Sequence, residues 1–304
     1  MNRPLRIGTR DSALALWQAN TLQERLEELG IESTLVPIKS QGDLDLKQPL
    51  YAMGVTGIFT KALDIALLNQ HIDLAIHSMK DVPTQLPKGI VQAAVLERGP
   101  VEDVMVWKNA QAKAKENHII ATGSLRRKAQ WKSKYPQDDV VNLRGNIQTR
   151  LEKLHASAWD GAIFAAAALE RLEITDEVVE PLIEFLPAAA QGALMVVCHV
   201  ADEDIAQQLT LLNHRESEVC TQIERDFLRT MEGGCTAPIG ALATLEGKNI
   251  HFSGGVFSLQ GSQAKTVEII FPIGEAKNKG IELAQELLLN GGKELMKEFK
   301  STHE

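Results

Sequence analysis

The stretch LRIGTRDSALALWQANTLQERLEELGIESTLVPI, residues 5–38, indicates the fold class. A short apolar run at 5–8 precedes leucines and a tryptophan at helical spacing, and a second apolar run follows at 32–38. Asp11 or Ser12 is placed to cap this helix, and Gly30 stands where helices commonly end. The strand–helix–strand unit predicts a parallel sheet.

The same alternation of short apolar runs and helical patterns continues through the middle of the chain. Strands are predicted at 72–77, 90–96, 103–107, 119–122, 140–143 and 161–166, and helices at 59–69, 125–135, 146–154 and near 169–172. The fully apolar run at 194–200 comes after this second series. Its position predicts a strand that returns to the first sheet.

The last third of the chain has a different pattern. A long helix is predicted at 215–231, ending at Gly233-Gly234. Three alternating segments at 239–245, 250–259 and 266–273 predict antiparallel strands, and a closing helical region at 280–300 is broken near Gly291-Gly292. The sequence therefore predicts two α/β series and a small C-terminal α+β unit.

Length and composition narrow the class of protein. The 304 residues predict two or three domains, and 44% hydrophobic with 24% charged residues is ordinary for a globular protein. A net charge of −8 argues against nucleic-acid binding through bulk electrostatics. The N-terminus lacks a signal-peptide pattern, and no apolar run approaches the ~18 residues that span a membrane. We expect a cytoplasmic protein.

Arginines stand where predicted strands lead into helices. They are Arg10, Arg126, Arg127, Arg144 and Arg150. Ligands of open α/β sheets bind beyond the carboxyl ends of the strands, where helix N-termini offer N–H donors. Guanidinium forks there suit a substrate with several carboxylates. The alternative is that each arginine lies on a solvated helix face, as most arginines do.

A second candidate feature is HSMKDVP, residues 77–83, at the end of a predicted strand. Asp81 follows Lys80 at a turn that Pro83 helps to fix. An aspartate facing a cationic cleft can stabilise developing positive charge or transfer a proton. The alternative is a surface ion pair in a loop.

The three cysteines have different settings. Cys198 lies in an apolar run and Cys220 in the middle of a helix, so both are expected to be buried. Cys235 lies in EGGCTAP, residues 232–238, on a glycine loop beyond the long helix, where a thiol can be a nucleophile or an attachment point. The odd number and the spacing argue against a disulfide framework, and no metal site is predicted.

The segment PAAAQGA, residues 187–193, places a polar pair at an apolar junction. Gln191 and Gly192 are consistent with a hinge or a cleft-lining turn. A plain connector is the alternative.

Taken together, these segments resemble the porphobilinogen deaminase (hydroxymethylbilane synthase) family nearly end to end. The matching blocks are RIGTRDSALALWQ (6–18), IHSMKDVP (76–83), TGSLRR (122–127), LRGNIQTRL (143–151), PAAAQGA (187–193) and ERDFLRTMEGGCTAPIG (224–240). Each block alone is weak evidence for the family, but six blocks in the family's order are specific evidence for it.

The resemblance implies a fold of three domains. Two lobes similar to those of type II periplasmic binding proteins would flank a cleft, and a small α+β domain would carry the cofactor loop. The implied divisions are 1–97 with 194–213 for the first domain, 98–193 for the second and 214–304 for the third.

The resemblance also assigns roles to residues. Cys235 would form a thioether to a dipyrromethane cofactor, and Asp81 would be the catalytic carboxylate. The implied cofactor- and substrate-binding residues are Arg10, Ser12, Phe59, Lys80, Thr122, Ser124, Arg126, Arg127, Arg144, Arg150, Gln191 and Gly192.

The activity implied is that of a transferase in tetrapyrrole and heme biosynthesis. Four porphobilinogen molecules would be condensed, with loss of ammonia, on the enzyme-bound primer, and hydrolysis would release hydroxymethylbilane. The implied partner is this small substrate. Nothing in the sequence demands an oligomer, so we expect a monomer, and we expect neither nucleic acid nor a membrane as partner.

Some positions depart from the better-known members of the family. Two loop lysines are replaced by Ala52 and Thr56, Ala121-Thr122-Gly123-Ser124 stands where Gly-Thr-Ser-Ser is common, and Ala190 replaces a glycine. These changes put the behaviour of the loop over the cleft in question, but they leave Asp81 and Cys235 in place.

Two other interpretations remain. A non-catalytic two-lobe anion- or solute-binding protein would share the fold, although it would not need Cys235 or a third domain. A degenerate, inactive relative is the other, and the intact acid and thiol positions argue against it.

Overall fold

The structure is a computed structural model that describes residues 3–39, 60–232 and 237–303. The described residues fall into two compact units. Unit 1 contains residues 3–39, 60–99 and 192–218, and unit 2 contains residues 100–191, 219–232 and 237–303.

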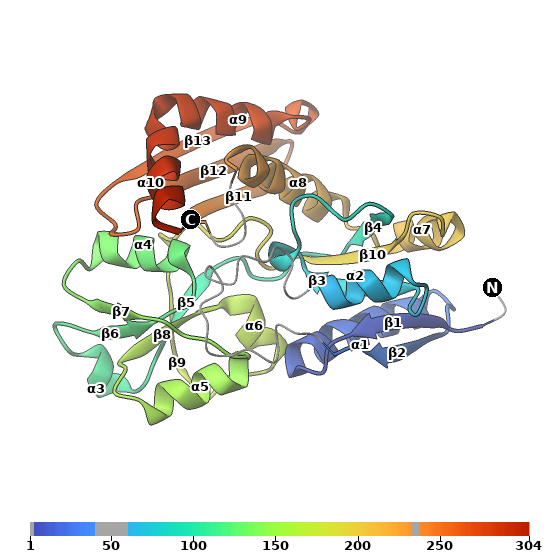
Figure 1. The fold of residues 1–304 in the computed structure, drawn as a ribbon, viewed down its shortest axis with the longest axis horizontal. Helices are drawn as coiled ribbons and strands as arrows, with labels where there is room; N and C mark the ends of the chain where they lie inside the picture. Colours follow the sequence, from blue (N-terminus) through green and yellow to red (C-terminus); the bar gives the residue numbers. More distant parts are fainter. Residues whose placement is uncertain (1–2, 40–59, 233–236, 304) are drawn as a thin grey trace. The chain divides into compact units, whose positions relative to one another are not determined.

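Unit 1 is built on a five-stranded mixed sheet (Figure 1). Its order is β2 (Ser33–Pro37), β1 (Leu5–Thr9), β3 (Leu74–Ser78), β10 (Leu194–His199) and β4 (Ile90–Val95). β1 pairs in parallel with β2 and β3, whereas β10 pairs antiparallel with both β3 and β4. The predicted return strand is therefore confirmed, and its reversed direction makes the sheet mixed.

Helices cover the sheet of unit 1. They are α1 (Ala13–Glu28), α2 (Lys61–Leu68) and α7 (Glu203–Leu209). The α1 helix begins at Ser12, whose hydroxyl accepts a hydrogen bond from the Ala15 N–H at 3.4 Å, and Gly30 with φ +74° follows its end. Leu22 and Leu26 of α1 join Ile7 of β1 in one buried cluster. The capping and periodicity read from the sequence are thus confirmed.

Unit 2 contains a second five-stranded sheet with the same arrangement. Its order is β7 (Asp139–Val141), β6 (Ile119–Ala121), β8 (Gly161–Ala165), β5 (Asp103–Trp107) and β9 (Val178–Pro181). β6 pairs in parallel with β7 and β8, and β5 pairs antiparallel with β8 and β9. Each sheet thus carries one reversed strand beside its third parallel strand, β10 in unit 1 and β5 in unit 2.

Four helices accompany this sheet, namely α3 (Ala110–Lys113), α4 (Leu125–Lys134), α5 (Ile147–Ala156) and α6 (Ala166–Arg171). Asn146 caps α5 by accepting a hydrogen bond from the Thr149 N–H at 2.9 Å. Leu151 and Leu154 of α5 pack with Phe164 of β8 in a buried cluster. The helix predicted at 146–154 is therefore confirmed, and its apolar face meets the sheet.

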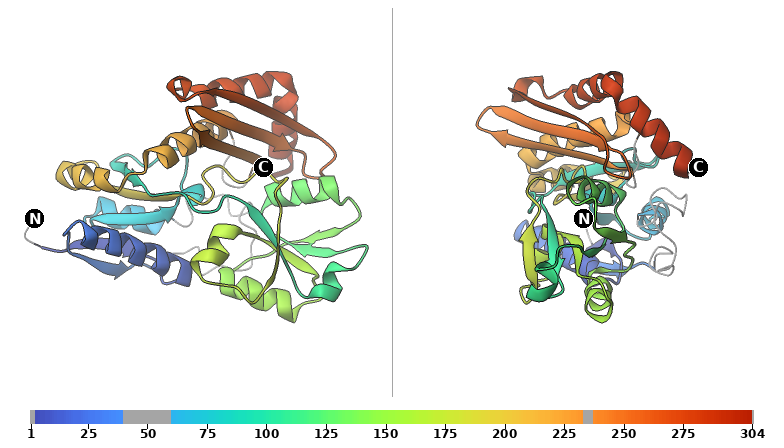
Figure 2. Two further views of the ribbon diagram at one scale, coloured as in Figure 1. Left: turned by 180° about the vertical axis from the view of Figure 1, so that it is seen from behind. Right: turned by 90° about the vertical axis from the view of Figure 1, so that its left-hand side faces the viewer.

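The C-terminal part of unit 2 is a three-stranded antiparallel sheet. Its strands, β11 (Ile239–Glu246), β12 (Asn249–Phe257) and β13 (Ala264–Pro272), pair in chain order. The helices that pack against it are α8 (Arg215–Thr230), α9 (Lys279–Leu287) and α10 (Lys293–His303). All three lie on one face of this sheet, as Figures 1 and 2 show from opposite sides.

The break predicted in the closing helical region is confirmed. Between α9 and α10 the segment Leu288–Gly292 leaves helical geometry, with Gly291 at φ +98°. The short elements α3, α7 and β9 were missed by the sequence, because four to seven residues carry too little periodicity.

The predicted α/β class is therefore confirmed, with two similar five-stranded sheets and a small C-terminal α+β part. The second lobe and the C-terminal part fall into one compact unit. The division into three domains at the predicted boundaries stays a prediction.

Candidate functional site

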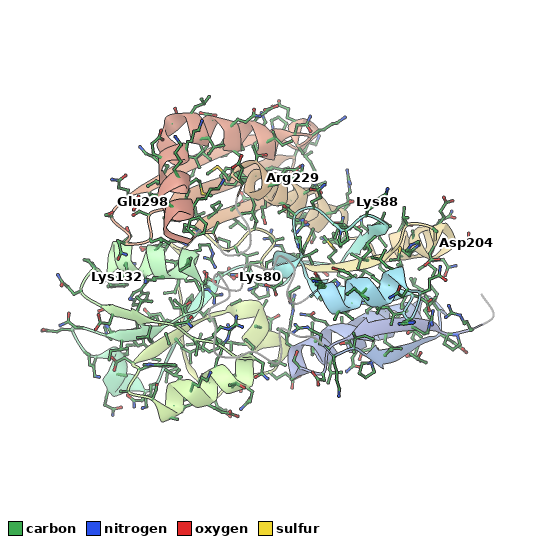
Figure 3. The ribbon with its side chains drawn as sticks, viewed as in Figure 1. Lys80, Lys88, Lys132, Asp204, Arg229 and Glu298 are labelled. Atoms are coloured by element: carbon green, nitrogen blue, oxygen red, sulfur yellow. The ribbon has the colours of Figure 1, made fainter. Side chains whose placement is uncertain are left out.

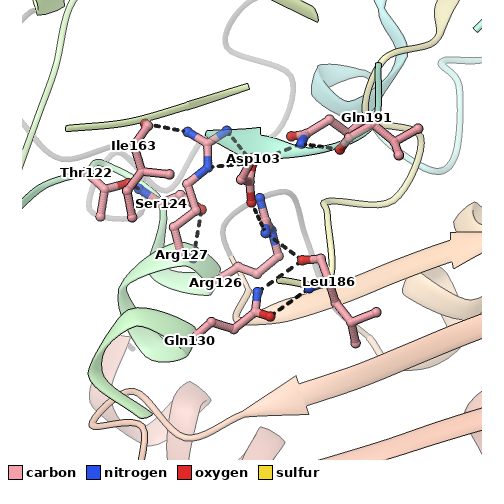
Figure 4. Close-up of polar contacts among 10 residues, drawn as sticks. Asp103, Thr122, Ser124, Arg126, Arg127, Gln130, Ile163, Leu186 and Gln191 are labelled. Carbon is pink, nitrogen blue, oxygen red and sulfur yellow. Dashed lines mark hydrogen bonds and ion pairs between the residues drawn. The ribbon is translucent and has the colours of Figure 1, made fainter. Parts of the chain in front are cut away.

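Asp103, the first residue of β5, is a buried acidic residue at the candidate site (Figure 4). Its side chain is fully buried and accepts hydrogen bonds from Arg126 Nη1 at 2.6 Å, Arg127 Nε at 2.9 Å and Gln191 Nε2 at 2.9 Å. Burial alone raises the pKa of Asp103, but the two guanidinium charges outweigh it and hold this pKa well below its usual range. Asp103 is therefore a buried carboxylate anion.

Local sequence explains why two arginines reach this point. After β6, Thr122 Oγ1 accepts a hydrogen bond from the Ser124 N–H at 3.2 Å, and the Ser124 hydroxyl caps α4 by accepting from the Arg127 N–H at 3.4 Å. Arg126 and Arg127 thus occupy the first turn of α4. Cations are disfavoured at a helix N-terminus, so a buried carboxylate is needed to hold them there.

The cluster of Asp103, Arg126 and Arg127 carries two positive charges and one negative charge. Arg126 is 3% exposed and uses Nη1 for Asp103 and for the Leu186 carbonyl, at 2.6 Å each. Its Nε–H and Nη2 groups donate to none of the residues that the structure describes. This edge is the one that binds a carboxylate with two parallel hydrogen bonds.

An excess positive charge in a buried place is costly unless an anion balances it. The observed cluster therefore fits a ligand that brings a carboxylate. A dipyrromethane with acetate and propionate side chains, which the sequence predicts as cofactor, meets that requirement.

The segment 186–191, called here the return segment, leads from the second lobe back to β10. The Leu186 carbonyl accepts from Arg126 and from Gln130 Nε2 at 3.0 Å, and the Leu186 N–H donates to Gln130 Oε1 at 2.8 Å. Gln191 Nε2 also donates to the Val101 carbonyl at 2.7 Å. Side chains of α4 and the start of β5 thus fasten both ends of this segment.

The C-terminal part of unit 2 holds the same segment from its other side. The Ala241 N–H donates to the Pro187 carbonyl at 3.0 Å. A side chain at Gly240 would come within 2.6 Å of Leu186 Cβ, so only glycine allows this approach. The predicted hinge or cleft-lining turn is therefore packed between two parts of unit 2.

In unit 1 the predicted catalytic carboxylate lies directly beyond β3. Met79–Asp81 forms a single 3₁₀ turn, closed by a hydrogen bond from the Val82 N–H to the Met79 carbonyl at 3.2 Å. Asp81 and Lys80 are both partly exposed, and Figure 3 labels Lys80. The turn is anchored by the Met79 N–H, which donates to the Ala193 carbonyl at 3.0 Å.

His77 precedes this turn and is buried in β3. Burial, with a smaller contribution from the charge of Arg10, lowers the pKa of His77 to about 4. Its Nε2 atom is buried and has no hydrogen-bond partner among the described residues. The imidazole is therefore neutral near pH 7 and lies close to the positive charge of Arg10.

The other predicted binding residues lie at the ends of strands or the starts of helices. Arg10 follows β1, and Ser12 caps α1. Arg144 is buried beyond β7 and its carbonyl accepts from Lys153 Nζ at 2.8 Å, while Arg150 Nε donates to the Gly145 carbonyl at 2.7 Å.

Gly192 has φ +85°, and its carbonyl accepts a hydrogen bond from the Gly99 N–H at 3.1 Å. This left-handed backbone is a reason for glycine at the turn. Cys198 and Cys220 are buried free cysteines, as predicted. Phe59 and Cys235, and the departures at Ala52 and Thr56, lie outside the described residues.

The structure thus brings Arg126, Arg127 and Gln191 together in unit 2, with Thr122 and Ser124 on the loop before them. Lys80 and Asp81 share one turn of unit 1, near the end of the strand that carries His77. Sequence reasoning missed Asp103, although an acid that opens the otherwise apolar run DVMVW was a visible signal.

Two family models match the chain. The model described as porphobilinogen deaminase, dipyromethane cofactor binding domain, matches residues 5–207, and the porphobilinogen deaminase C-terminal domain matches residues 219–289.

Curated relatives agree with these matches. The porphobilinogen deaminase of Chloroherpeton thalassium is 38% identical over 312 residues, covering 99% of each chain. The porphobilinogen deaminase of Chlorobium phaeobacteroides is 40% identical over 315 residues, covering 99% of this chain and 100% of the relative.

Among solved structures, an ancestral cationic amino acid solute binding protein covers 69% of this chain and 87% of its own. Its TM-score is 0.44 and its sequence identity is 13%, a level at which the likeness carries no argument about function.

Proposed function

This chain belongs to the porphobilinogen deaminase family, and from that premise we propose which of its residues hold the substrate and carry out the reaction. The family activity is that of a transferase in tetrapyrrole biosynthesis, which joins porphobilinogen units on a dipyrromethane cofactor. The observation that carries the assignment is the buried, net positive cluster of Asp103, Arg126 and Arg127.

Arg126 and Arg127 hold carboxylates of the pyrrole side chains. Porphobilinogen carries an acetate and a propionate, so each added unit brings two negative charges. The Nε–Nη2 edge of Arg126 supplies two parallel donors, and α4 fixes its direction.

Two serines of the proposed binding set also donate to carboxylates. Ser12 and Ser124 accept backbone N–H groups as helix caps, which leaves their hydroxyl hydrogens available to a carboxylate. The rest of the proposed set is Arg10, Phe59, Lys80, Thr122, Arg144, Arg150, Gln191 and Gly192.

Asp81 is the catalytic carboxylate. Loss of ammonia from porphobilinogen leaves an electron-poor pyrrole, and a carboxylate beside its nitrogen stabilises the developing positive charge. The same group accepts or returns the proton that moves when aromaticity is restored. The single 3₁₀ turn holds Asp81 three residues beyond the end of β3 rather than in a long loop.

Cys235 is the attachment point of the cofactor. When bound, the dipyrromethane supplies the pyrrole carbon to which the next unit is joined. Its acid groups balance the positive charge of the arginine cluster, so that cofactor and binding residues stabilise each other.

We further propose a cytoplasmic monomer that binds no nucleic acid. The net charge of −8 argues against binding of nucleic acid. Among the described residues, no helix is long and apolar enough to cross a membrane. We also propose domain divisions at 1–97 with 194–213, 98–193 and 214–304.

The deciding experiment is the intact mass of the purified, denatured chain, followed by peptide mapping. We expect a mass excess of two linked pyrrole units on the Cys235 peptide, together with turnover of porphobilinogen. Cys235→Ser should carry no covalent pyrrole, whereas the matched control Cys198→Ser should carry as much as the parent, because Cys198 is buried in β10. A chain that stays unmodified and inactive after incubation with porphobilinogen would instead favour the non-catalytic binding protein.

A further inference from the structure

The carboxylate of Asp103 divides its two oxygens between the two arginines. Oδ2 accepts from Arg126 Nη1 at 2.6 Å, and Oδ1 accepts from Arg127 Nε at 2.9 Å with Arg127 Nη2 at 2.8 Å. Each guanidinium is therefore held in one orientation by a different oxygen. Long arginine side chains otherwise have many rotamers, and a buried partner selects one of them.

Asp103 also keeps the two guanidinium groups side by side. Neighbouring like charges in a buried site repel each other strongly, because the surroundings screen them poorly. The carboxylate between them offsets most of this repulsion. One positive charge remains, so the pair stays attractive to an incoming anion.

The orientation of Arg126 follows directly from this arrangement. Its Nη1 group donates to Asp103 and to the Leu186 carbonyl, and no residue in the described part of the chain accepts from the opposite edge, Nε with Nη2. Arg127 is held differently: Asp103 Oδ1 contacts its Nε and Nη2, and the Ile163 carbonyl accepts from its Nη1 at 2.9 Å. Asp103 is the charged partner that each guanidinium has in addition to its backbone acceptor.

Gln191 adds a connection to the return segment. Its Nε2 donates to Asp103 Oδ1 at 2.9 Å, so the same carboxylate that orients the arginines also holds the end of that segment (Figure 4). The Asp103 carboxylate therefore fixes both the arginine pair and the end of the return segment.

We propose that Asp103 is a positioning residue, which aims Arg126 and Arg127 at the acid groups of cofactor and substrate and fastens the return segment to them. This role rests on the proposed function of the site. Asp103 itself is fully buried and acts through the arginines and Gln191.

The test compares Asp103→Asn with Asp138→Asn in the full-length holoenzyme. Asp138 is a matched control because it is also buried, at 2% exposure, and also fastens α4, through a hydrogen bond from Trp131 Nε1 at 2.9 Å. The carboxylate of Asp138 also accepts from the His118 N–H at 2.9 Å and lies 3.2 Å from His118 Nδ1. Both variants remove one buried negative charge from the same lobe, so their losses of thermal stability can be compared directly.

In Asp103→Asn we expect KM for porphobilinogen to rise about tenfold or more, with kcat changed by no more than about threefold, because the loss falls on ligand capture. Intact mass should show a smaller share of chains with covalent dipyrromethane. In Asp138→Asn both kinetic constants should stay within about twofold of the parent. Equal kinetics and equal cofactor content in the two variants would overturn the positioning role.

If Asp103→Asn does not fold, Asp103→Glu keeps the charge and displaces the carboxylate by one methylene. It is then combined with Arg126→Lys. A shared role predicts that the double variant has a KM close to that of the worse single variant, whereas independent effects would multiply and overturn the proposal. If the parent chain carries no covalent adduct and shows no turnover, the proposed function itself is overturned. Failure of the positioning role alone leaves the parent chain active, so the two outcomes can be told apart.

Discussion

The carboxylate of Glu224 in α8 accepts a hydrogen bond from the main-chain N–H of Ala190 at 2.6 Å. Its second oxygen accepts from the Ala243 N–H of β11 at 2.7 Å. Glu224 is fully buried, so this side chain ties the return segment to the C-terminal sheet without help from solvent. Both N–H groups would otherwise be buried donors without an acceptor.

Replacing Glu224 by Gln should destabilise the protein. The amide nitrogen would face one of the two N–H donors, and a buried donor left without its acceptor costs about 1–3 kcal/mol. Urea unfolding followed by circular dichroism measures the change. Glu216→Gln, at an exposed site on the same helix, should change the free energy of unfolding by only a few tenths of a kcal/mol. Equal effects at the two positions would contradict the role of Glu224.

Ala190 adopts φ +61°, in the left-handed region that favours glycine. This conformation accounts for the glycine that is common at this position, from which alanine departs. Alanine in this region is strained by about 1–2 kcal/mol, but its buried methyl group and the lower entropy of its unfolded chain offset much of that. A β-branched side chain has no such compensation.

We therefore expect Ala190→Gly to alter the free energy of unfolding by less than about 1 kcal/mol, and Ala190→Val to cost more than about 2 kcal/mol. Denaturant midpoints of the three proteins measure both effects. Ala189→Val, at a neighbouring buried alanine for which no positive φ is recorded, separates crowding from backbone strain. A valine at 190 that is tolerated as well as glycine would contradict the assigned conformation.

Local signals predicted most of the fold. Ser12 and Gly30 mark the ends of α1, and the apolar run that became β10 was correctly assigned to the first sheet. These features depend on residues close in sequence or on a simple apolar pattern. The antiparallel direction of β5 depends instead on the path by which the chain passes from the first lobe to the second. Local periodicity contains no information on that path.

The candidate site was predictable in its residue types but not in its contacts. The arginines at strand-to-helix junctions were found, yet their common partner Asp103 lies more than 20 positions earlier in the chain. Ser124 and Gln191 were placed at the site by resemblance, and the structure adds that one caps α4 and the other bonds to Asp103. Long-range ion pairs depend on tertiary packing, so a single sequence does not specify them.

His77 should make stability depend on pH. The unfolded chain takes up a proton on this group near pH 6.5, whereas the folded chain does so only near pH 4. The unfolded state therefore binds more protons between these values, and stability falls as the pH is lowered through this window, by up to about 3 kcal/mol at its acid end.

His77→Leu should remove this contribution, because leucine does not titrate and leaves no buried nitrogen without a partner. The free energy of unfolding of parent and variant, measured from pH 8 to about pH 4 where the usual carboxylates begin to titrate, should diverge below pH 6.5. The control His71→Gln is at an exposed site and should follow the parent curve. Parallel curves for parent and His77→Leu would show that His77 protonates equally in both states.

Asp81→Asn should retain the fold and the covalent cofactor but lose most turnover. The amide is nearly isosteric, so the 3₁₀ turn at Met79–Asp81 is preserved, but it neither balances a developing positive charge nor accepts a proton. General acid–base groups contribute factors of about 10²–10⁴, so kcat should fall at least about 100-fold. Asp81→Glu should lose less, because it keeps the charge and displaces it by one methylene.

The measurement is the rate of hydroxymethylbilane formation, with intact mass recorded on the same samples to verify that the cofactor is present. Asp204→Asn removes a carboxylate from an exposed site on α7 of the same unit and should leave kcat unchanged. Near-parent turnover in Asp81→Asn would transfer the catalytic role to another group. A loss of turnover accompanied by loss of the adduct would instead place Asp81 in cofactor assembly, since a chain without its primer cannot begin the reaction.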